Sequence, residues 1–190
     1  VNLRLMIFLC GLFFLFAPQI STRAQSYTTT IFPSDQGWYR QINGAGGTHD
    51  STNNNFLVGT FINGASNEKY RDFFVFNLSG LSTNRTVTSA SLTIQNPFNY
   101  GAPGTYTTWD VSTPISTLTA GGTGLSGIFS DLGSGTSYAS VTLASSATNP
   151  VVTNFNTSGL TAINSNRGGS IAFGGSYVEG ALSQAVFGYN

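Results

Sequence analysis

Charged side chains are scarce in this sequence. Seven basic and seven acidic residues make up 7% of its 190 residues, whereas an ordinary soluble domain carries about 25%. Because there is no basic excess, the chain lacks the electrostatic footprint of a nucleic-acid-binding protein, and we expect no nucleic-acid partner. The shortage of Glu, Lys and Arg also excludes coiled coils and helical bundles.

Cysteine and histidine occur once each. Cys10 lies in an apolar N-terminal run, and one histidine cannot fill the four positions of a zinc site. A catalytic triad would need a nucleophile and an orienting acid near His49 in space, and nothing in the sequence shows either, so we expect a solvated loop histidine.

Small polar residues are abundant instead. Ser, Thr, Asn and Gly supply 87 of the 190 residues, yet the chain is 40% hydrophobic and 13% aromatic. That apolar content is enough to build a core, and it excludes a disordered chain.

Residues 1–24 have the pattern of a secretory signal peptide. Arg4 precedes an apolar run from Leu5 to Ala17, Pro18 ends the run, and Thr22-Arg23-Ala24 places small residues at a cleavage site. The run is short for a transmembrane helix, although an uncleaved N-terminal anchor is the alternative.

Cleavage after Ala24 would leave residues 25–190 as a single domain, secreted to the extracellular space or the cell surface and without a membrane span. Removing 24 of the 190 residues leaves 166, which is enough for one sizeable core. The mature chain would keep five basic and seven acidic side chains, a net charge of −2, and no cysteine. It therefore has to be stable without disulfides.

The clearest strand signal is Lys69–Leu78. Phe74 and Phe76 fall on one face of this strand and Phe73 and Val75 on the other, because strand side chains alternate. Apolar residues on both faces predict a central strand that is covered on two sides.

The strand predicted at Thr86–Gln95 is different, because Ala90, Leu92 and Ile94 alternate with polar residues and indicate one wet face. About ten short strands separated by Gly, Asn, Ser and Pro predict an all-β fold, an antiparallel β-sandwich. The other predicted strands are Tyr27–Phe32, Trp38–Ile42, Phe56–Ile62, Thr105–Val111 (Trp109 and Val111 inward), Ser137–Leu143 (Val141 and Leu143 inward), Val151–Phe155, Ser170–Phe173 and Gln184–Tyr189.

Two segments depart from the strand pattern. Thr157–Asn164 begins with Thr and Ser, which cap helices, and predicts one short helix. Pro114–Gly135 is rich in glycine but carries six large apolar residues, which a solvated loop would not hold. We therefore expect it to be a long loop that covers Phe73 and Val75.

The order of several segments resembles a known group of proteins. They are YRDFFVFNLSGL (Tyr70–Leu81), TVTSASLTIQNP (Thr86–Pro97), the block from Tyr106 to Gly135, GGSIAFGG (Gly168–Gly175) and VFGYN (Val186–Asn190). The chain resembles the secreted bacterial β-sandwich domains that often precede a PEP-CTERM sorting signal, and its middle is similar to DNRLRE-type carbohydrate-binding-like modules. The resemblance implies a jelly-roll type of sandwich at the cell surface or in extracellular matrix, without catalysis. The sorting tail itself is absent from this sequence.

Carboxylates do not form an evident catalytic pair. Glu68 and Asp72 flank the start of a strand beside Lys69 and Arg71, which is typical of a salt-bridged strand end. Glycoside hydrolysis needs two carboxylates across the scissile bond, so we expect no enzyme. The acidic side chains are Asp35, Asp50, Glu68, Asp72, Asp110, Asp131 and Glu179.

A structural calcium ion is the one metal that the sequence could hold. Asp50 and Asn53, within Asp-Ser-Thr-Asn-Asn-Asn, supply hard oxygen ligands, and Asp35 could join them. The alternative is an Asx-rich turn that satisfies its own backbone. No other cofactor is expected.

Aromatic residues outside the strong strands give the best binding signal. Trp38 and Tyr39 follow a glycine, Tyr100 lies with Phe98 in a predicted loop, and Tyr177 lies in a predicted loop at Gly174–Gly180. Flat aromatic faces near amides and hydroxyls suit sugar rings. The alternative places Trp38 in the core.

Two functions follow. The first is a structural or adhesive exoprotein that contacts matrix polysaccharide or other surface proteins. The second is a glycan-binding module that uses these aromatic residues.

Overall fold

The fold is given by a computed structural model, which describes residues 26–52, 55–94, 98–101, 103–143, 150–179 and 185–189. The predicted signal peptide, residues 1–24, lies outside the described residues, and so does Asn53. The chain divides into two units, Val1–Thr30 and Ile31–Asn190. The described part of the first unit, residues 26–30, contains no strand or helix, and everything below concerns the second unit.

The described residues form eleven strands and three helices, and every strand pair is antiparallel. The predicted all-β antiparallel fold is therefore confirmed, while its jelly-roll type stays a prediction. The elements are β1 (Pro33–Ile42), β2 (Ala45–Thr48), β3 (Phe56–Asn63), β4 (Ser66–Asn77), β5 (Ser91–Ile94), β6 (Phe98–Gly101), β7 (Gly104–Asp110), α1 (Ile115–Leu118), α2 (Ser126–Asp131), β8 (Ser137–Leu143), β9 (Val151–Asn154), α3 (Thr157–Ser165), β10 (Ser170–Glu179) and β11 (Ala185–Tyr189).

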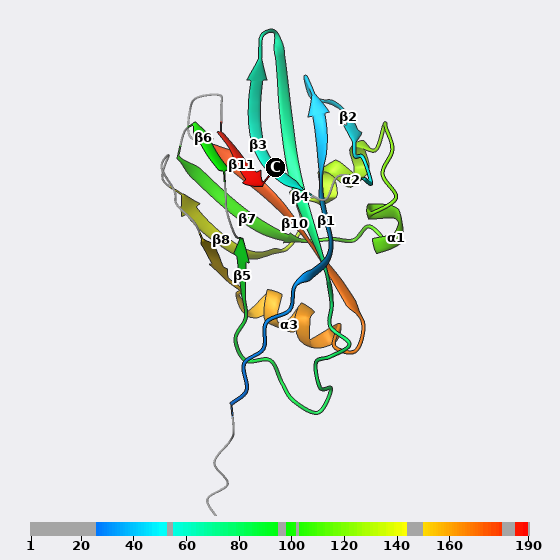
Figure 1. Cartoon of the computed structure of the whole chain (residues 1–190), viewed down its shortest axis with the longest axis vertical. Coiled ribbons are helices and arrows are strands. Elements are labelled where there is room, and N and C mark those ends of the chain that lie inside the picture. Colours follow the sequence, from blue (N-terminus) through cyan, green and yellow to red (C-terminus); the bar gives the residue numbers. More distant parts are fainter. Residues whose placement is uncertain are drawn as a thin grey trace, which may run out of the picture. The chain divides into compact units, whose positions relative to one another are not determined.

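Strand β4 organises the large sheet (Figure 1). Along one edge it pairs with β1 from Phe76 to Glu68. Its other edge pairs first with β10, as far as Asp72, and then with β3, starting at Tyr70. The strand order is therefore β6-β11-β3-β4-β10-β7-β8, and β3 and β10 separate from each other at the middle of β4.

One face of β4 packs into the sandwich core. Phe74 is buried there with side chains of β3, β7, β8 and β10. The small sheet formed by β5 and β9 contributes Leu92, Ile94 and Val151 to the same cluster. The predicted alternation at Leu92 and Ile94 is confirmed, since both are buried while Ser91 and Thr93, which alternate with them, are exposed. The strand itself is shorter than Thr86–Gln95, because it begins only at Ser91.

The opposite face of β4 is covered by the Pro114–Gly135 segment, as the sequence predicts. Phe73 and Val75 are buried against apolar side chains of that segment. The segment is not the long loop that was expected, because it holds two short helices, α1 and α2, which lie beside β1 and β2 in Figure 1. With α3 the described residues contain three helices in place of the one predicted. The side chains that the segment buries are Leu118, Ile128, Phe129 and Leu132.

Helix α3 covers a third cluster at the end of β4. Its Ile163 packs with Leu78, Ile171 and Phe173, and the helix is drawn there in Figure 1. The predicted helix is confirmed, but its cap is not the Ser or Thr that the sequence favours. The N-cap is Asn156, whose side-chain oxygen accepts a hydrogen bond from the Gly159 amide at 3.0 Å.

Several inward positions differ from the prediction. Phe76 is only partly buried at the junction of two clusters. In β7 the fully buried residues are Tyr106 and Thr108. Trp109 lies on the other face of the sheet, where the α1–α2 segment also lies. Along β8 the prediction holds for Leu143, which is buried, while Val141 is partly buried.

The strand predicted at Tyr27–Phe32 is wrong. Residues 26–32 are not in a strand, and β1 begins at Pro33. Tyr27 and Phe32, the two ends of the predicted strand, are 75% and 81% exposed. Among the described residues, no helix is long and apolar enough to cross a membrane.

Truncating Phe73 should destabilise the protein about as much as truncating Phe74. Both rings are buried, on opposite faces of β4, and removing a buried Phe costs about 3–5 kcal/mol. Phe76→Ala should cost less, because its ring is only partly buried. Denaturant unfolding of the three variants checks the order, and a Phe73→Ala protein as stable as wild type would show that the α1–α2 segment does not cover β4.

Candidate functional site

Two of the predicted glycan-binding aromatics belong to the core. Tyr39 is 0% exposed, and its hydroxyl donates a 2.7 Å hydrogen bond to the Leu118 carbonyl beneath α1. Tyr177 is 6% exposed and stands opposite Tyr106 in the β10–β7 ladder. The expected loop around Tyr177 is wrong, because β10 runs past Phe173 to Glu179 and turns the ring inward. Neither tyrosine presents a face to a sugar.

The other two predicted glycan-binding aromatics are Trp38 and Tyr100. Trp38 is half-buried, its indole donates to the Asn55 side-chain oxygen at 2.9 Å, and Tyr70 meets it edge to face at 5.3 Å. These contacts favour the packing interpretation of Trp38. Tyr100 lies in strand β6 and not in a loop, and its side chain lies outside the described residues.

The two predicted calcium ligands that the structure describes are exposed, Asp50 beside a turn and Asp35 in strand β1. The Asp50 carboxylate accepts hydrogen bonds from the amide of Thr52 at 2.9 Å and from its hydroxyl at 2.7 Å. The Asp35 carboxylate accepts one from the Gln36 amide at 2.8 Å. This is the self-satisfied turn of the alternative interpretation. No group of three His, Cys, Asp or Glu side chains comes together in the described ranges, and calcium stays a prediction.

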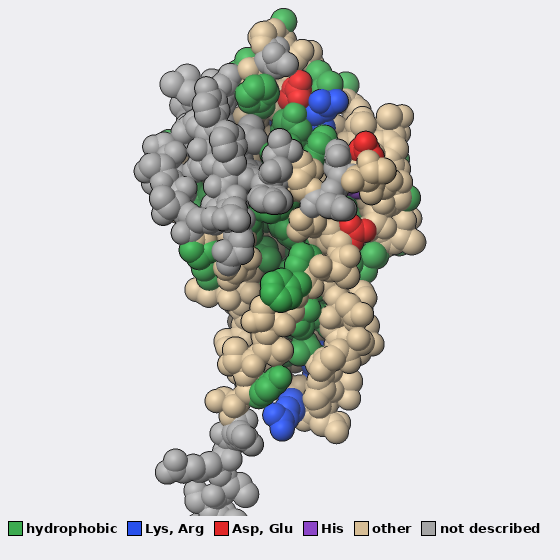
Figure 2. All heavy atoms as spheres, viewed as in Figure 1, with side chains coloured by type: hydrophobic (Ala, Val, Ile, Leu, Met, Phe, Trp, Pro, Cys, Tyr) green, Lys and Arg blue, Asp and Glu red, His purple; other side chains and the backbone are tan. Residues whose placement is uncertain are grey.

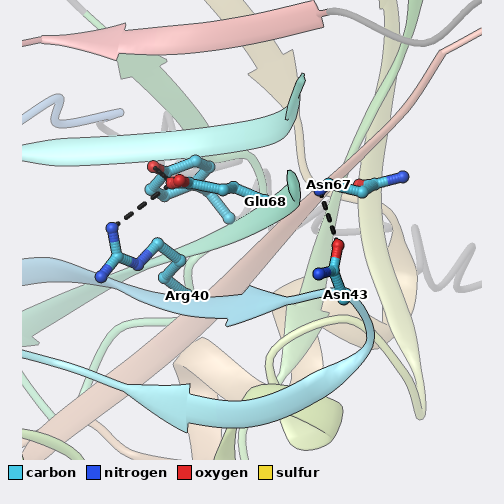
Figure 3. Close-up of polar contacts among 5 residues, drawn as sticks. Arg40, Asn43, Asn67 and Glu68 are labelled. Atoms are coloured by element: carbon cyan, nitrogen blue, oxygen red, sulfur yellow. Dashed lines mark hydrogen bonds and ion pairs between the residues drawn. The ribbon is translucent and has the colours of Figure 1, made fainter. Parts of the chain in front are cut away.

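The predicted salt bridge at the start of β4 forms with a different partner. Glu68 pairs with Arg40 of β1 at 3.3 Å, and the Tyr70 hydroxyl donates to the same carboxylate oxygen at 2.5 Å (Figure 3). Burial and the Glu68 carboxylate raise the pKa of Tyr70 to about 12. Lys69 cannot reach this cluster, because alternation turns it to the other face of β4. The arrangement fixes the register of β1 on β4.

A second tie between the same strands lies at their turns. Asn43 has a positive φ of 52° in the β1–β2 turn, a conformation that Asn tolerates. Its side-chain oxygen accepts a hydrogen bond from the Asn67 amide at 2.8 Å (Figure 3). Its own amide donates to the Asn67 carbonyl at 2.7 Å.

The most unusual carboxyl is Asp72, which is fully buried where β3 and β10 separate. The Tyr106 hydroxyl donates to it at 3.2 Å. Burial raises the pKa of Asp72 to about 8, so the carboxyl is mainly protonated at neutral pH. Gly175 leaves room for the pair, since a Cβ there would collide with both side chains. The buried pair is an interior hydrogen bond that no substrate reaches.

His49 is buried as well, at 4% exposure, so the expected solvated loop histidine is wrong. Its Nδ1 donates to the Trp38 carbonyl at 2.8 Å, and its ring packs against Tyr39 and Phe73. Its backbone also exchanges two hydrogen bonds with Gly122 of the α1–α2 segment. Burial lowers the pKa of His49, which favours the neutral ring.

Two further aspartates hold the ends of the α1–α2 segment. The Asp131 carboxylate accepts hydrogen bonds from the amides and hydroxyls of Ser112 and Thr113 at 2.7–3.3 Å. These bonds lower the pKa of Asp131, against the opposing effect of its burial. The Asp110 carboxylate accepts one from the Thr136 amide at 2.7 Å.

A pocket of about 220 Å³ lies on the side of the sheet that carries the α1–α2 cover, in the angle between β3 and β10. Its position follows from the separation of these two strands along one edge of β4. The residues that line it include Lys69 and Arg71 of β4, Trp109 of β7, Ser176 and Val178 of β10, and Thr60 of β3. Sequence reasoning missed this pocket, because Trp109 was assigned to the core and Lys69 to a salt bridge.

A scan against protein-family models finds no match to the chain, and a search of curated proteins finds no similar sequence.

Asp72→Asn should change how stability depends on pH. In the folded protein the pKa of Asp72 is about 8, against about 3.9 for an aspartate in an unfolded chain. Between these values the folded state keeps a proton that the unfolded state releases. The free energy of unfolding of the wild-type protein therefore falls as the pH rises. The stability of Asp72→Asn relative to wild type should therefore increase from about pH 4 to about pH 8.

Denaturant unfolding of both proteins across this pH range measures the difference. His49 contributes equally to both proteins and cancels. Thr93→Ala, which changes an exposed and uncharged side chain of β5, is the control, and its stability relative to wild type should stay constant across this range. A constant difference between Asp72→Asn and wild type would contradict a protonated buried carboxyl.

Proposed function

We propose that this protein is a non-catalytic, exported β-sandwich with a structural or adhesive role at the cell surface or in extracellular matrix. One observation carries the proposal. Each of the six described carboxylates accepts a hydrogen bond from another group of the protein. They are Asp35, Asp50, Glu68, Asp72, Asp110 and Asp131.

This use of the carboxylates is the opposite of what a glycosidase needs. Such an enzyme keeps one carboxyl protonated beside the leaving group and a second one free to act on the other side of the bond. Asp72 has the raised pKa, but it is enclosed by Tyr106 and Gly175. This use of the acidic residues supports a non-catalytic role.

The outer surface suits weak, extended contacts. Exposed positions of β5, β8 and β9 are mostly Ser, Thr and Asn, such as Thr93, Ser140 and Asn154. In the face drawn in Figure 2, charged side chains are few and most of the surface is neutral. Such a surface gives little long-range steering and offers many hydroxyls and amides to a hydrated matrix. The resemblance to PEP-CTERM-associated sandwich domains points to the same role and to a jelly-roll arrangement.

Glycan binding is the second candidate function. The burial of Tyr39 and Tyr177 removes two of the expected contacts. The observation that favours this candidate is the pocket beside Trp109, where a partly buried indole lies next to hydroxyls and two cations. Its partners would be extracellular polysaccharides.

Export should remove residues 1–24. The reason is the signal-peptide pattern of Arg4, the Leu5–Ala17 run and Ala24. Intact-mass analysis of protein from the surface and matrix fractions of expressing cells checks this, with a chain that begins at residue 25 as the size standard. A protein that keeps Leu5–Ala17, or that stays inside the cell, would contradict the proposed export and surface role.

The purified protein should release no reducing sugar from a panel of polysaccharides. The physical reason is that its carboxylates are held by the structural bonds described above. Turnover that disappears in Asp72→Asn or Asp110→Asn, while the variant keeps its fold by circular dichroism, would show that the protein is a hydrolase.

A further inference from the structure

We infer that the pocket between β3 and β10 binds a carboxylate-bearing sugar unit of an acidic polysaccharide, such as a uronic acid. This inference goes beyond the proposed structural role, because it assigns a binding site and a ligand class. Three features of the pocket support this inference: its cations, its aromatic wall and its size.

The first feature is an excess of positive charge. Lys69, the only lysine of the chain, and Arg71 both line the pocket. Their side chains lie on the same face of β4, two residues apart. Within the described part of the chain neither has a carboxylate partner, and the pocket has no acidic lining residue.

The other described cations differ from this pair. Arg40 is paired with Glu68, and Arg167 donates to the carbonyls of Ser82 and Thr83. Arg85 is exposed on a turn. Two of the five cations that follow residue 25 therefore meet at one pocket of a chain that has very little charge.

Arg71 is held in place before any ligand arrives. Its Nη1 donates to the carbonyls of Phe129 and Ser130 at 2.7 and 3.0 Å, and its guanidinium lies 4.5 Å from the centre of the Phe129 ring. Partial burial keeps water from the Arg71 guanidinium and thereby lowers its pKa. A poorly solvated cation gains from a nearby anion, and a fixed one binds it with little loss of entropy.

The second feature is the aromatic wall. Trp109 is partly buried, and its indole donates a 2.8 Å hydrogen bond to the Ser176 hydroxyl, which fixes the orientation of the ring. Val178 extends the apolar wall and is 68% exposed. An oriented indole suits the C–H face of a sugar ring, while Lys69 at the exposed side of the pocket would take its carboxylate.

The third feature is size. At about 220 Å³ the pocket is smaller than the roughly 300–1,000 Å³ of sites for drug-sized ligands. It therefore suits one ring of a polymer, and the rest of the chain would extend over the surface. Two cations without an acidic neighbour favour an acidic ring over a neutral one.

Titration with trigalacturonic acid, followed by NMR, tests the inference. The chain contains two tryptophans, so the indole N–H signals of Trp109 and Trp38 can be assigned with Trp109→Phe. The Trp109 signal should shift and saturate, and the Trp38 signal should not. The fully methyl-esterified form of trigalacturonic acid keeps the sugar rings but loses the charge, and it should bind at least about tenfold more weakly.

Two matched variants separate a specific site from general attraction. Lys69→Gln and Arg85→Gln each remove one positive charge from an exposed position. Lys69→Gln should weaken binding about tenfold, and Arg85→Gln by less than about twofold. Thermal unfolding confirms that both variants remain folded, which their exposure leads us to expect.

Four results would overturn the inference. They are an absence of binding up to about 10 mM, equal binding of the acid and its ester, an equal effect of the two variants, and an equally strong response to acetate alone. The last would indicate an ion site without sugar recognition. Because this experiment uses purified protein, its failure would leave the tests of export and surface location intact, and their failure would leave the binding result intact.

Discussion

The structure depends on one strand that is apolar on both faces. Phe74 on one side of β4 and Phe73 and Val75 on the other must all leave water, and burying such side chains is the dominant favourable term in folding. A single sheet can cover only one of these faces. The small β5–β9 sheet closes the first face, and the α1–α2 segment closes the second. Every other feature is arranged around this double cover.

The polar interior follows from the same constraint. His49 and Asp131 tie the α1–α2 segment to the sheet through hydrogen bonds to backbone and side chains. Asp72 and Tyr106 satisfy each other where β3 and β10 separate. The described part of the chain has no disulfide, so these hydrogen bonds are the polar contacts that hold the α1–α2 segment on the sheet. The separation of the two strands also opens the pocket on the other face, so one irregularity of the sheet generates both the buried acid and the candidate binding site.

Much of the fold could be predicted, because hydrophobic alternation reports burial directly. The pattern of Phe73 to Phe76 predicted a strand covered on two sides, and the six apolar residues of Pro114–Gly135 predicted the cover. Register and strand length were harder. Tyr177 was placed in a loop because Gly174 and Gly175 resemble turn residues, whereas they allow Leu132 and Tyr106 to approach β10 closely. The turn at Asn43-Gly44 carried a hairpin signal that could have located β2.

The candidate site was not predictable from local patterns. Lys69, Arg71 and Trp109 meet only because β10 leaves β4 at Asp72, and a branch of this kind has no sequence signature. In the sequence His49 and Asp72 look like solvated polar residues. Only the tertiary fold brings the Trp38 carbonyl to His49 and the Tyr106 hydroxyl to Asp72.

Native-state hydrogen exchange tests the central claim most directly, because it reports the stability of each backbone amide. If both faces of β4 are covered, the amides of Phe73, Phe74 and Val75 should exchange only through global unfolding. Their exchange free energies should equal the free energy of unfolding measured with denaturant. If those amides exchanged through a smaller local opening, together with the α1–α2 segment, the double cover of β4 would not be what holds this structure together.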